Sequence, residues 1–329
     1  MLENPPFVSI VIPVRNEGRI LDRCLESIRN LEYPAERVEV IVADSLSTDD
    51  SRQIAESYGA KVVPNRRQTV VSGRNRGFEV AQGEFIAFTD ADCIVRSDWL
   101  KAALNNFDAE VVAGVGGVTL FPDEATPFQK AVNVLFAMAG FTGSTAHRQQ
   151  IETTQYVDDI PGCNCMYRRS ALDLVMPIDE KLLTAEDVWL NWLLSERGYR
   201  HVASQHMVLW HHRRSRSRTF IRQMYRFAIG RLQVGKRARR LLKLSHVLVG
   251  LSVPLMVGML LAAWACGLLW IPVATALLGW FGLFAVGVLK AKSWVAGFCL
   301  PMVCLLFVTS WSCGFLRELL VPMAQVDGK

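Results

Sequence analysis

The chain has 329 residues, 51% of them hydrophobic, and a mean hydropathy of +0.21. This composition is too apolar for an ordinary soluble protein and indicates membrane segments. The net charge of +5 arises from one basic segment beside the apolar end, which favours lipid phosphates over nucleic acid as the partner of that segment.

The first part of the chain alternates predicted strands and helices. Apolar runs predict strands at Phe7–Pro13, Val38–Ala43, Lys61–Pro64 and Glu84–Thr89. Helical spacing of apolar residues predicts helices at Gly18–Leu31, Asp50–Tyr58 and Val71–Ala81. This alternation predicts a mostly parallel, Rossmann-like α/β sheet with right-handed crossovers that binds a nucleotide at its C-terminal edge. Neither GxGxxG nor a P-loop pattern occurs, so those two modes of phosphate binding are not supported.

The pattern is less regular beyond Val111. We expect strands at Val112–Leu120 and Cys163–Arg169, an apolar helix at Thr126–Gly140 near the membrane or over the binding site, and a polar loop at Gln149–Asp159. A further helix begins at Thr184, the expected N-cap, and stops at Gly198. Cys163 and Cys165 have no second Cys/His pair at matching spacing, so we interpret them as small, partly buried residues.

Two uncharged stretches near the C-terminus predict three transmembrane helices. Val247 to Leu289 is long enough for two crossings with a turn near residues 266–272, and Trp294 to Leu316 for one, since about 20 helical residues span the hydrocarbon core. We therefore divide the chain into a domain at residues 1–212, a basic amphipathic interfacial segment at 213–244 and a membrane region at 245–329.

Charge predicts how the chain is oriented. Arg213 to Lys243 contains twelve Lys or Arg and no acid, which marks the cytoplasmic side, and Lys290 and Lys292 fall on the same side. The polar start of the chain does not resemble a secretory signal, so we expect a multi-pass protein of the plasma (inner) membrane with a cytoplasmic first domain and an extracytoplasmic tail. Within the basic segment, one apolar helix face suits a membrane surface: Phe220, Ile221, Met224, Phe227 and Ala228.

Asp90-Ala91-Asp92 follows the apolar run that forms the fourth strand. Ionised carboxylates are almost never buried without a partner, and in open α/β sheets ligands bind at the carboxyl ends of strands. Two acids at alternate positions there suit a hard divalent cation and hence a sugar-nucleotide diphosphate. The alternative for such a motif taken alone is a solvated Asp-rich turn.

Several further motifs occur in a recognisable order. They are Ile12 to Glu17, Asp44 to Asp49, Gly73 to Gly77, Ala81 to Glu84, Asp90 to Asp92, Gly162 with Tyr167-Arg168-Arg169, and Glu186-Asp187. Their order and spacing resemble glycosyltransferase family 2, the inverting GT-A enzymes, over about residues 8–232. The membrane region makes the chain similar to members that extend lipid-linked saccharides.

The resemblance implies roles for individual residues in binding a UDP- or GDP-sugar. Pro13 and Glu17 would contact the nucleoside, and Asp44 the base. The next position often carries a second Asp in this family but is Ser45 here, which leaves the base open. Arg74 would face the diphosphate. Asp90 would contact the ribose or the metal's water shell, and Asp92 would bind Mg²⁺ or Mn²⁺.

The resemblance also places the catalytic base in the Glu186-Asp187 pair. Inversion requires one base that removes the proton of the acceptor hydroxyl, and we favour Asp187. Glu186 would hold the acceptor or raise the pKa of the base by like-charge repulsion. The structural alternative is that both acids merely favour the start of a helix.

Residues 223–227 partly match the QxxRW element of processive synthases, with Phe227 in place of Trp. Gln223 and Arg226 are therefore assigned to acceptor or diphosphate contact, alongside the interfacial role of this segment. The leading hypothesis is a metal-dependent inverting transferase acting on a lipid-linked saccharide or polyprenyl phosphate. The alternatives are a processive polysaccharide synthase and a non-catalytic GT-A-like membrane scaffold.

Overall fold

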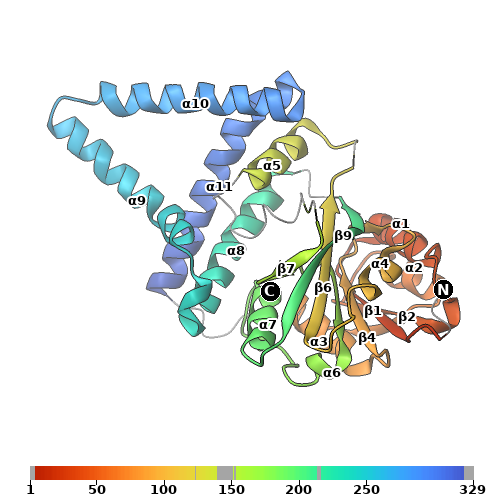
Figure 1. Cartoon of the computed structure of the whole chain (residues 1–329). Helices are drawn as coiled ribbons and strands as arrows, with labels where there is room; N and C mark the ends of the chain where they lie inside the picture. The colour runs from red at the N-terminus through yellow and green to blue at the C-terminus, as the bar shows by residue number, and fades with distance from the viewer. Residues whose placement is uncertain (1–3, 123, 139–150, 152, 213–215, 322–329) are drawn as a thin grey trace. The chain divides into compact units, whose positions relative to one another are not determined.

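A computed structural model describes residues 4–122, 124–138, 151, 153–212 and 216–321 (Figure 1). The chain forms two compact units, one built from residues up to 122 and 151–212, the other from 124–138 and 216–321. The second unit thus includes 124–138, which the sequence-based division placed in the first domain, and 216–244, which that division set apart. The reason is packing, because these segments share one apolar core with the last helix of the chain.

The first unit has a sheet of nine strands. They are β1 (Val8–Val14), β2 (Val38–Asp44), β3 (Lys61–Pro64), β4 (Phe85–Thr89), β5 (Cys93–Val95), β6 (Val112–Leu120), β7 (Gln155–Val157), β8 (Asn164–Arg168) and β9 (Arg200–His211). Its helices are α1 (Gly18–Arg29), α2 (Ser51–Ser57), α3 (Val70–Val80), α4 (Trp99–Leu104), α6 (Arg169–Leu172) and α7 (Glu186–Ser195), with a 3-10 turn at Ala35–Arg37. The α/β fold predicted from the sequence is confirmed.

The strand order is β3-β2-β1-β4-β8-β6-β9-β5, with β7 beside β9. The first four strands are parallel, as expected for β-α-β units. Beyond β4 the sheet is mixed, since β8 is antiparallel to both β4 and β6, while β6 and β9 are parallel. The expectation of a mostly parallel sheet therefore holds for the half formed by β1 to β4, and the other half departs from it.

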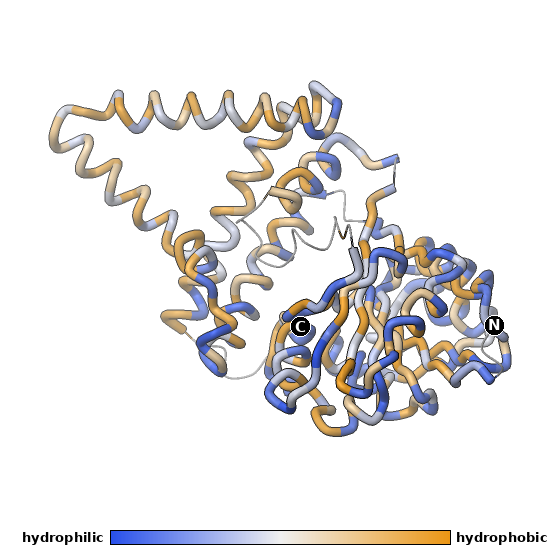
Figure 2. Tube along the Cα trace, viewed as in Figure 1, coloured by the Kyte–Doolittle hydropathy of each residue, from blue (hydrophilic) through white to orange (hydrophobic). Residues whose placement is uncertain are grey.

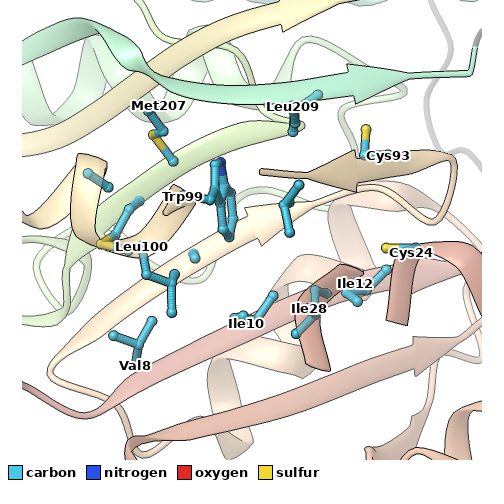
Figure 3. Close-up of a cluster of buried hydrophobic side chains, with 14 of the residues drawn as sticks. Val8, Ile10, Ile12, Cys24, Ile28, Cys93, Trp99, Leu100, Met207 and Leu209 are labelled. Atoms are coloured by element: carbon cyan, nitrogen blue, oxygen red, sulfur yellow. The ribbon is translucent and has the colours of Figure 1, made fainter. Parts of the chain in front are cut away.

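Helices cover both faces of the sheet. On one face, α1 and α4 pack on β1, β8 and β9, and Trp99 lies in the middle of this core (Figure 3). On the other face, α3 packs on β1, and α7 is joined to β8 by a hydrogen bond from the Tyr167 hydroxyl to Asn191 Oδ1 at 2.7 Å. Helices thus pack on both faces of the sheet and hold its strands in place.

Several elements differ from the sequence-based expectation. β7 lies within the predicted polar loop, because its three residues pair with β9. Residues 149, 150 and 152 of that loop, and the tail after residue 321, lie outside the described residues. The N-cap of α7 is Ala185, in the left-handed conformation at φ 63°, and Thr184 precedes it. The short elements β5 and α4 and the long strand β9 were not predicted.

The second unit consists of helices. They are α5 (Pro127–Ala137), α8 (Ser217–Arg237), a 3-10 turn at Arg239–Leu241, α9 (Leu244–Ala265), α10 (Trp270–Ala291) and α11 (Trp294–Leu320). The last three are long and apolar enough to cross a membrane, as predicted. In their most apolar windows, 6% of the residues of α9, 11% of α10 and 56% of α11 are buried. Figure 2 shows hydrophobic residues along much of α9 and α10, and most of these side chains are exposed.

Helix α11 packs with α5 and α8 to form the core of this unit (Figure 1). Phe220, Met224 and Ala228 of α8 are buried in that core, whereas Ile221 and Phe227 are exposed. The apolar face predicted for the membrane surface is therefore mostly occupied inside the unit. Lys236 of α8 donates to Glu318 Oε1 at 3.0 Å, which ties α8 to α11 by a partly buried ion pair.

Close approach of α3 to β1 yields a test of the fold. An alanine Cβ at Gly77 would lie 2.2 Å from Val11 Cγ1, so we expect Gly77→Ala to destabilise the protein by about 1–3 kcal/mol through overpacking. Thermal unfolding of the detergent-solubilised full-length chain measures this as a lower Tm. Gly258→Ala in α9, where no atom lies within 4 Å, is the matched control. Val11→Ala should partly rescue Gly77→Ala, and equal melting of all variants would contradict this packing.

Candidate active site

The topology gathers the chemistry-bearing residues at one edge of the sheet. β1, β2 and β4 are parallel and end there, and β8 begins there, with Asn164 opposite Thr89. β9 also ends at this edge, where His211 pairs with Cys93 at the start of β5. Asp90 and Asp92 lie between the end of β4 and the start of β5, and therefore come together with residues from 70 to 120 positions later in the chain.

Two loops at this edge are joined into one structure. Asn16, at φ 54°, donates its backbone N–H to Ser47 Oγ at 3.0 Å, and its side-chain Oδ1 accepts from the Thr48 N–H at 2.7 Å. Asp44, which ends β2, accepts from the Ser47 N–H at 3.1 Å and is buried. The end of β1 with Pro13, the loop with Glu17 that follows it, and the loop that follows Asp44 are thus joined by hydrogen bonds.

Arg74 of α3 lies at the centre of the site. Its side chain is buried and donates to Glu186 Oε1 at 2.8 Å and to the Gly162 carbonyl at 2.9 Å, with Asp90 Oδ1 at 3.4 Å. Among the described residues, its Nε has no hydrogen-bond partner. A Cβ at Gly162 would lie 2.4 Å from Arg74 Nη1, so only glycine leaves room for this guanidinium. Arg74 therefore connects the strand end that carries Asp90 with the start of α7.

The electrostatics of this group reflect its burial. Burial raises the pKa of both the Glu186 and the Asp90 carboxyl, and the Arg74 guanidinium opposes the rise in each case. The pKa of Arg74 lies above its ordinary value because Glu186 and Asp90 outweigh the effect of burial. The guanidinium stays charged and holds the two carboxyls in place.

The two acids at the start of α7 have different surroundings. Glu186 is 8% exposed and bound to Arg74. Asp187 is half-buried, and its two carboxylate oxygens accept from the backbone N–H groups of Gly162, at 3.1 Å, and Val188, at 2.8 Å. These backbone donors orient the Asp187 carboxylate, and Glu186 is engaged with a cation. The two neighbouring acids thus have different partners.

The structure brings His211 next to the Asp90-Ala91-Asp92 motif (the DxD motif). The sequence alone indicated no role for this histidine. His211 Nε2 lies 3.2 Å from Asp92 Oδ1, and the Asp92 carbonyl accepts from the His212 N–H at 2.8 Å. An adjacent carboxylate and imidazole can bind a divalent cation such as Mn²⁺, because both are suitable ligands for it. The signal in the sequence was a His-His pair at the end of the unpredicted strand β9.

Gln223 and Arg226 lie on α8 in the second unit, and their assignment stays a prediction.

His201 gives a pH-dependent test of how α7 is held. His201 Nε2 lies 3.0 Å from the Asn191 carbonyl, and burial lowers the pKa of the imidazole below 6.5. Below that pH the unfolded chain takes up a proton that the folded chain excludes, so the free energy of unfolding falls by up to about 1.4 kcal/mol per pH unit. We expect the Tm of His201→Gln to fall less than wild type between pH 7.5 and 5.5. Parallel Tm curves would contradict a neutral, buried His201.

Comparisons with known proteins agree with this geometry. The model of glycosyl transferase family 2 matches residues 9–175. Glycosyltransferase AglE of Haloferax volcanii is 26% identical over 242 residues, which cover 71% of this chain and 76% of AglE. The dolichyl N-acetyl-alpha-D-glucosaminyl phosphate 3-beta-D-2,3-diacetamido-2,3-dideoxy-beta-D-glucuronosyltransferase of Methanococcus voltae is 24% identical, over 66% of this chain and 70% of that protein.

Among solved structures, the chain is similar to the mannosyltransferase PcManGT of Pyrobaculum calidifontis in complex with GDP-Man and Mn²⁺. The TM-score is 0.65 at 21% identity, and the match covers 96% of this chain and 88% of PcManGT. This likeness concerns the fold, and it confirms the predicted GT-A architecture. With the family model matching half of its length, the chain belongs to glycosyl transferase family 2 and is a glycosyltransferase.

Proposed function

We propose that this glycosyltransferase inverts the anomeric carbon of a UDP- or GDP-sugar and transfers the sugar to a lipid-linked saccharide or polyprenyl phosphate. The observation that carries the proposal is the Arg74 network, in which one buried cation contacts both Asp90, beside the proposed donor site, and Glu186, beside the proposed base. Groups proposed to bind the donor and to remove the proton are thus linked through one side chain, which would help to orient donor and acceptor for a single displacement.

The donor would bind along the strand ends. Pro13 near the end of β1, Glu17 in the loop after it and Asp44 at the end of β2 would hold the nucleoside. The buried Asp44 carboxylate would accept a hydrogen bond from the base. Asp90 would contact the ribose or the water shell of the cation. Asp92 and His211 would hold Mg²⁺ or Mn²⁺, since they are the carboxylate and imidazole brought to 3.2 Å. The bound cation would neutralise the charge of the departing nucleoside diphosphate.

Asp187 is the proposed general base. Two backbone N–H groups fix its carboxylate, which is more exposed than that of Glu186. An acceptor hydroxyl within hydrogen-bond reach of Asp187 would lose its proton to this carboxylate as the new bond forms. Glu186 is bound to Arg74, so we propose that it orients the Glu186-Asp187 pair. Arg74 itself is engaged by protein groups, and we propose that it positions Asp90 and Glu186 as well as placing positive charge near the diphosphate.

The acceptor class is inferred from the second unit. Three apolar helices and the basic helix α8 suit an enzyme that meets its acceptor at the cytoplasmic membrane face. The name of the Methanococcus voltae relative specifies a dolichyl-phosphate-linked sugar as its acceptor. Gln223 and Arg226 would contribute acceptor or diphosphate contacts, and the basic residues of α8 would meet membrane lipids. A processive synthase is less well supported because Phe227, 38% exposed, replaces the Trp of the QxxRW element.

Donor binding can be measured directly. In isothermal titration of the detergent-solubilised protein, we expect UDP or GDP to bind with Mn²⁺ and to bind much more weakly without it. Asp92→Ala should remove the effect of Mn²⁺, because the ion loses its carboxylate ligand. Metal-independent binding, equal in Asp92→Ala, would overturn the metal role. No binding of either nucleotide to folded protein would favour the scaffold alternative.

The two acids of α7 can be separated kinetically. We expect Asp187→Asn to lower kcat by about 10²- to 10⁴-fold, the usual effect of losing a general base, with little change in the Kd of the nucleotide. Glu186→Gln should affect nucleotide affinity as well, because Arg74 loses its charged partner. The measurement is transfer of radiolabelled sugar to lipid extract or a synthetic polyprenyl acceptor, with the anomeric configuration read by NMR. If Asp187→Asn stays active while Glu186→Gln does not, Glu186 is the base.

A further inference from the structure

Two cysteines and a histidine meet beside the DxD motif. The Cys93 and Cys163 sulfurs and one imidazole nitrogen of His211 all lie within 4.8 Å of one another. Cys93 is buried, and the other two side chains are half-buried. The sequence reading compared Cys163 only with its neighbour Cys165. The cluster escaped that comparison because its members are separated by 48 and 70 positions in the chain.

The sheet itself holds the three residues together. Cys93 and His211 are register partners across the antiparallel pair β5 and β9. Cys163 directly precedes β8, whose first residue Asn164 is paired with Thr89 at the end of β4. Each side chain is thus placed by a strand end and needs no loop movement to reach the others. Ligand groups on strands are positioned more precisely than those on loops.

The three ligand atoms need only small shifts to surround one ion. In a tetrahedral zinc site, with bonds of about 2.0–2.3 Å, the ligand atoms are about 3.3–3.8 Å apart. The two sulfurs and the imidazole nitrogen lie within 4.8 Å of one another, so shifts of about 1 Å bring them to that spacing. Two sulfurs and one nitrogen are ligands that zinc accepts, with water in the fourth position.

We propose that Cys93, Cys163 and His211 form a binding site for Zn²⁺ or a similar thiolate-seeking cation. Ion binding releases the protons of the two thiols to solvent and leaves thiolates bound to the metal. Mg²⁺ and Mn²⁺ prefer oxygen ligands, and thiolates select zinc, so the site discriminates by ligand chemistry.

A consequence for activity follows from a shared ligand. His211 also belongs to the site proposed for the catalytic cation, so zinc and the catalytic cation would compete for its imidazole. This consequence, and not zinc binding itself, rests on the proposed function. We expect Zn²⁺ to inhibit Mn²⁺-supported transfer in wild type, and a variant without the two thiols to resist that inhibition.

X-ray absorption at the zinc edge tests the site without any substitution. The detergent-solubilised full-length protein is stripped of metal, kept reduced with a phosphine, and loaded with one equivalent of Zn²⁺ in the absence of nucleotide. We expect two sulfur scatterers at about 2.3 Å. A spectrum with only oxygen and nitrogen neighbours would overturn the proposal, whether or not the protein transfers sugar.

Cobalt(II) absorption and zinc affinity then assign the ligands. We expect sulfur-to-metal charge transfer in wild type and in the matched control Cys165→Ala, whose thiol lies outside the cluster, and its loss in Cys93→Ala with Cys163→Ala. The Kd for Zn²⁺ should rise in the double variant by at least the ~10–100-fold seen when outer-shell partners of a metal are removed. Unchanged charge transfer and affinity in a double variant that still melts cooperatively would refute the assignment.

Discussion

Arg74 carries a positive charge into the interior of the first unit, and the geometry of the site depends on how that charge is neutralised. A buried guanidinium is tolerated only when carboxylates and carbonyls surround it, and here Glu186, Asp90 and the Gly162 carbonyl do so. These partners come from α7, the end of β4 and the segment before β8. One ion network therefore fixes the relative positions of three chain segments that sequence distance leaves unrelated.

Gly162 connects this ion network to the proposed base. Gly162 leaves space for the guanidinium, accepts one of its hydrogen bonds, and donates its own N–H to Asp187. A side chain at position 162 would thus disturb the Arg74 guanidinium and the proposed base Asp187 together. Lysine in place of Arg74 would keep the charge but lose the planar fork that reaches several acceptors at once. The site is consequently a set of mutually dependent contacts, in which single substitutions are not expected to act additively.

Sequence patterns predicted the regular part of this molecule well. Apolar runs and their turns located β1 to β4 and β6 within a residue or two. For β1, β4 and β6 the reason is burial on both faces, which leaves a continuous hydrophobic signal. β9 has a mixed pattern and pairs with strands on both sides, so its formation depends on partners that local sequence does not reveal. The same limit applies to His211 and Cys93, which meet only through that pairing. The engagement of Arg74 by Glu186 is likewise a tertiary event between residues 112 positions apart.

Helix α11 is buried far more deeply than the other two long apolar helices. Phe307, Trp311 and Phe315 form a core with α5 and α8, whereas α9 and α10 bury little of their length. The last helix is therefore a folding element of the second unit and cannot be regarded as an interchangeable anchor. Chains shortened before residue 294 would leave the apolar faces of α5 and α8 uncovered and prone to aggregation. Removal of the three apolar helices is therefore not sufficient to make this enzyme soluble, and those faces need to be redesigned as well.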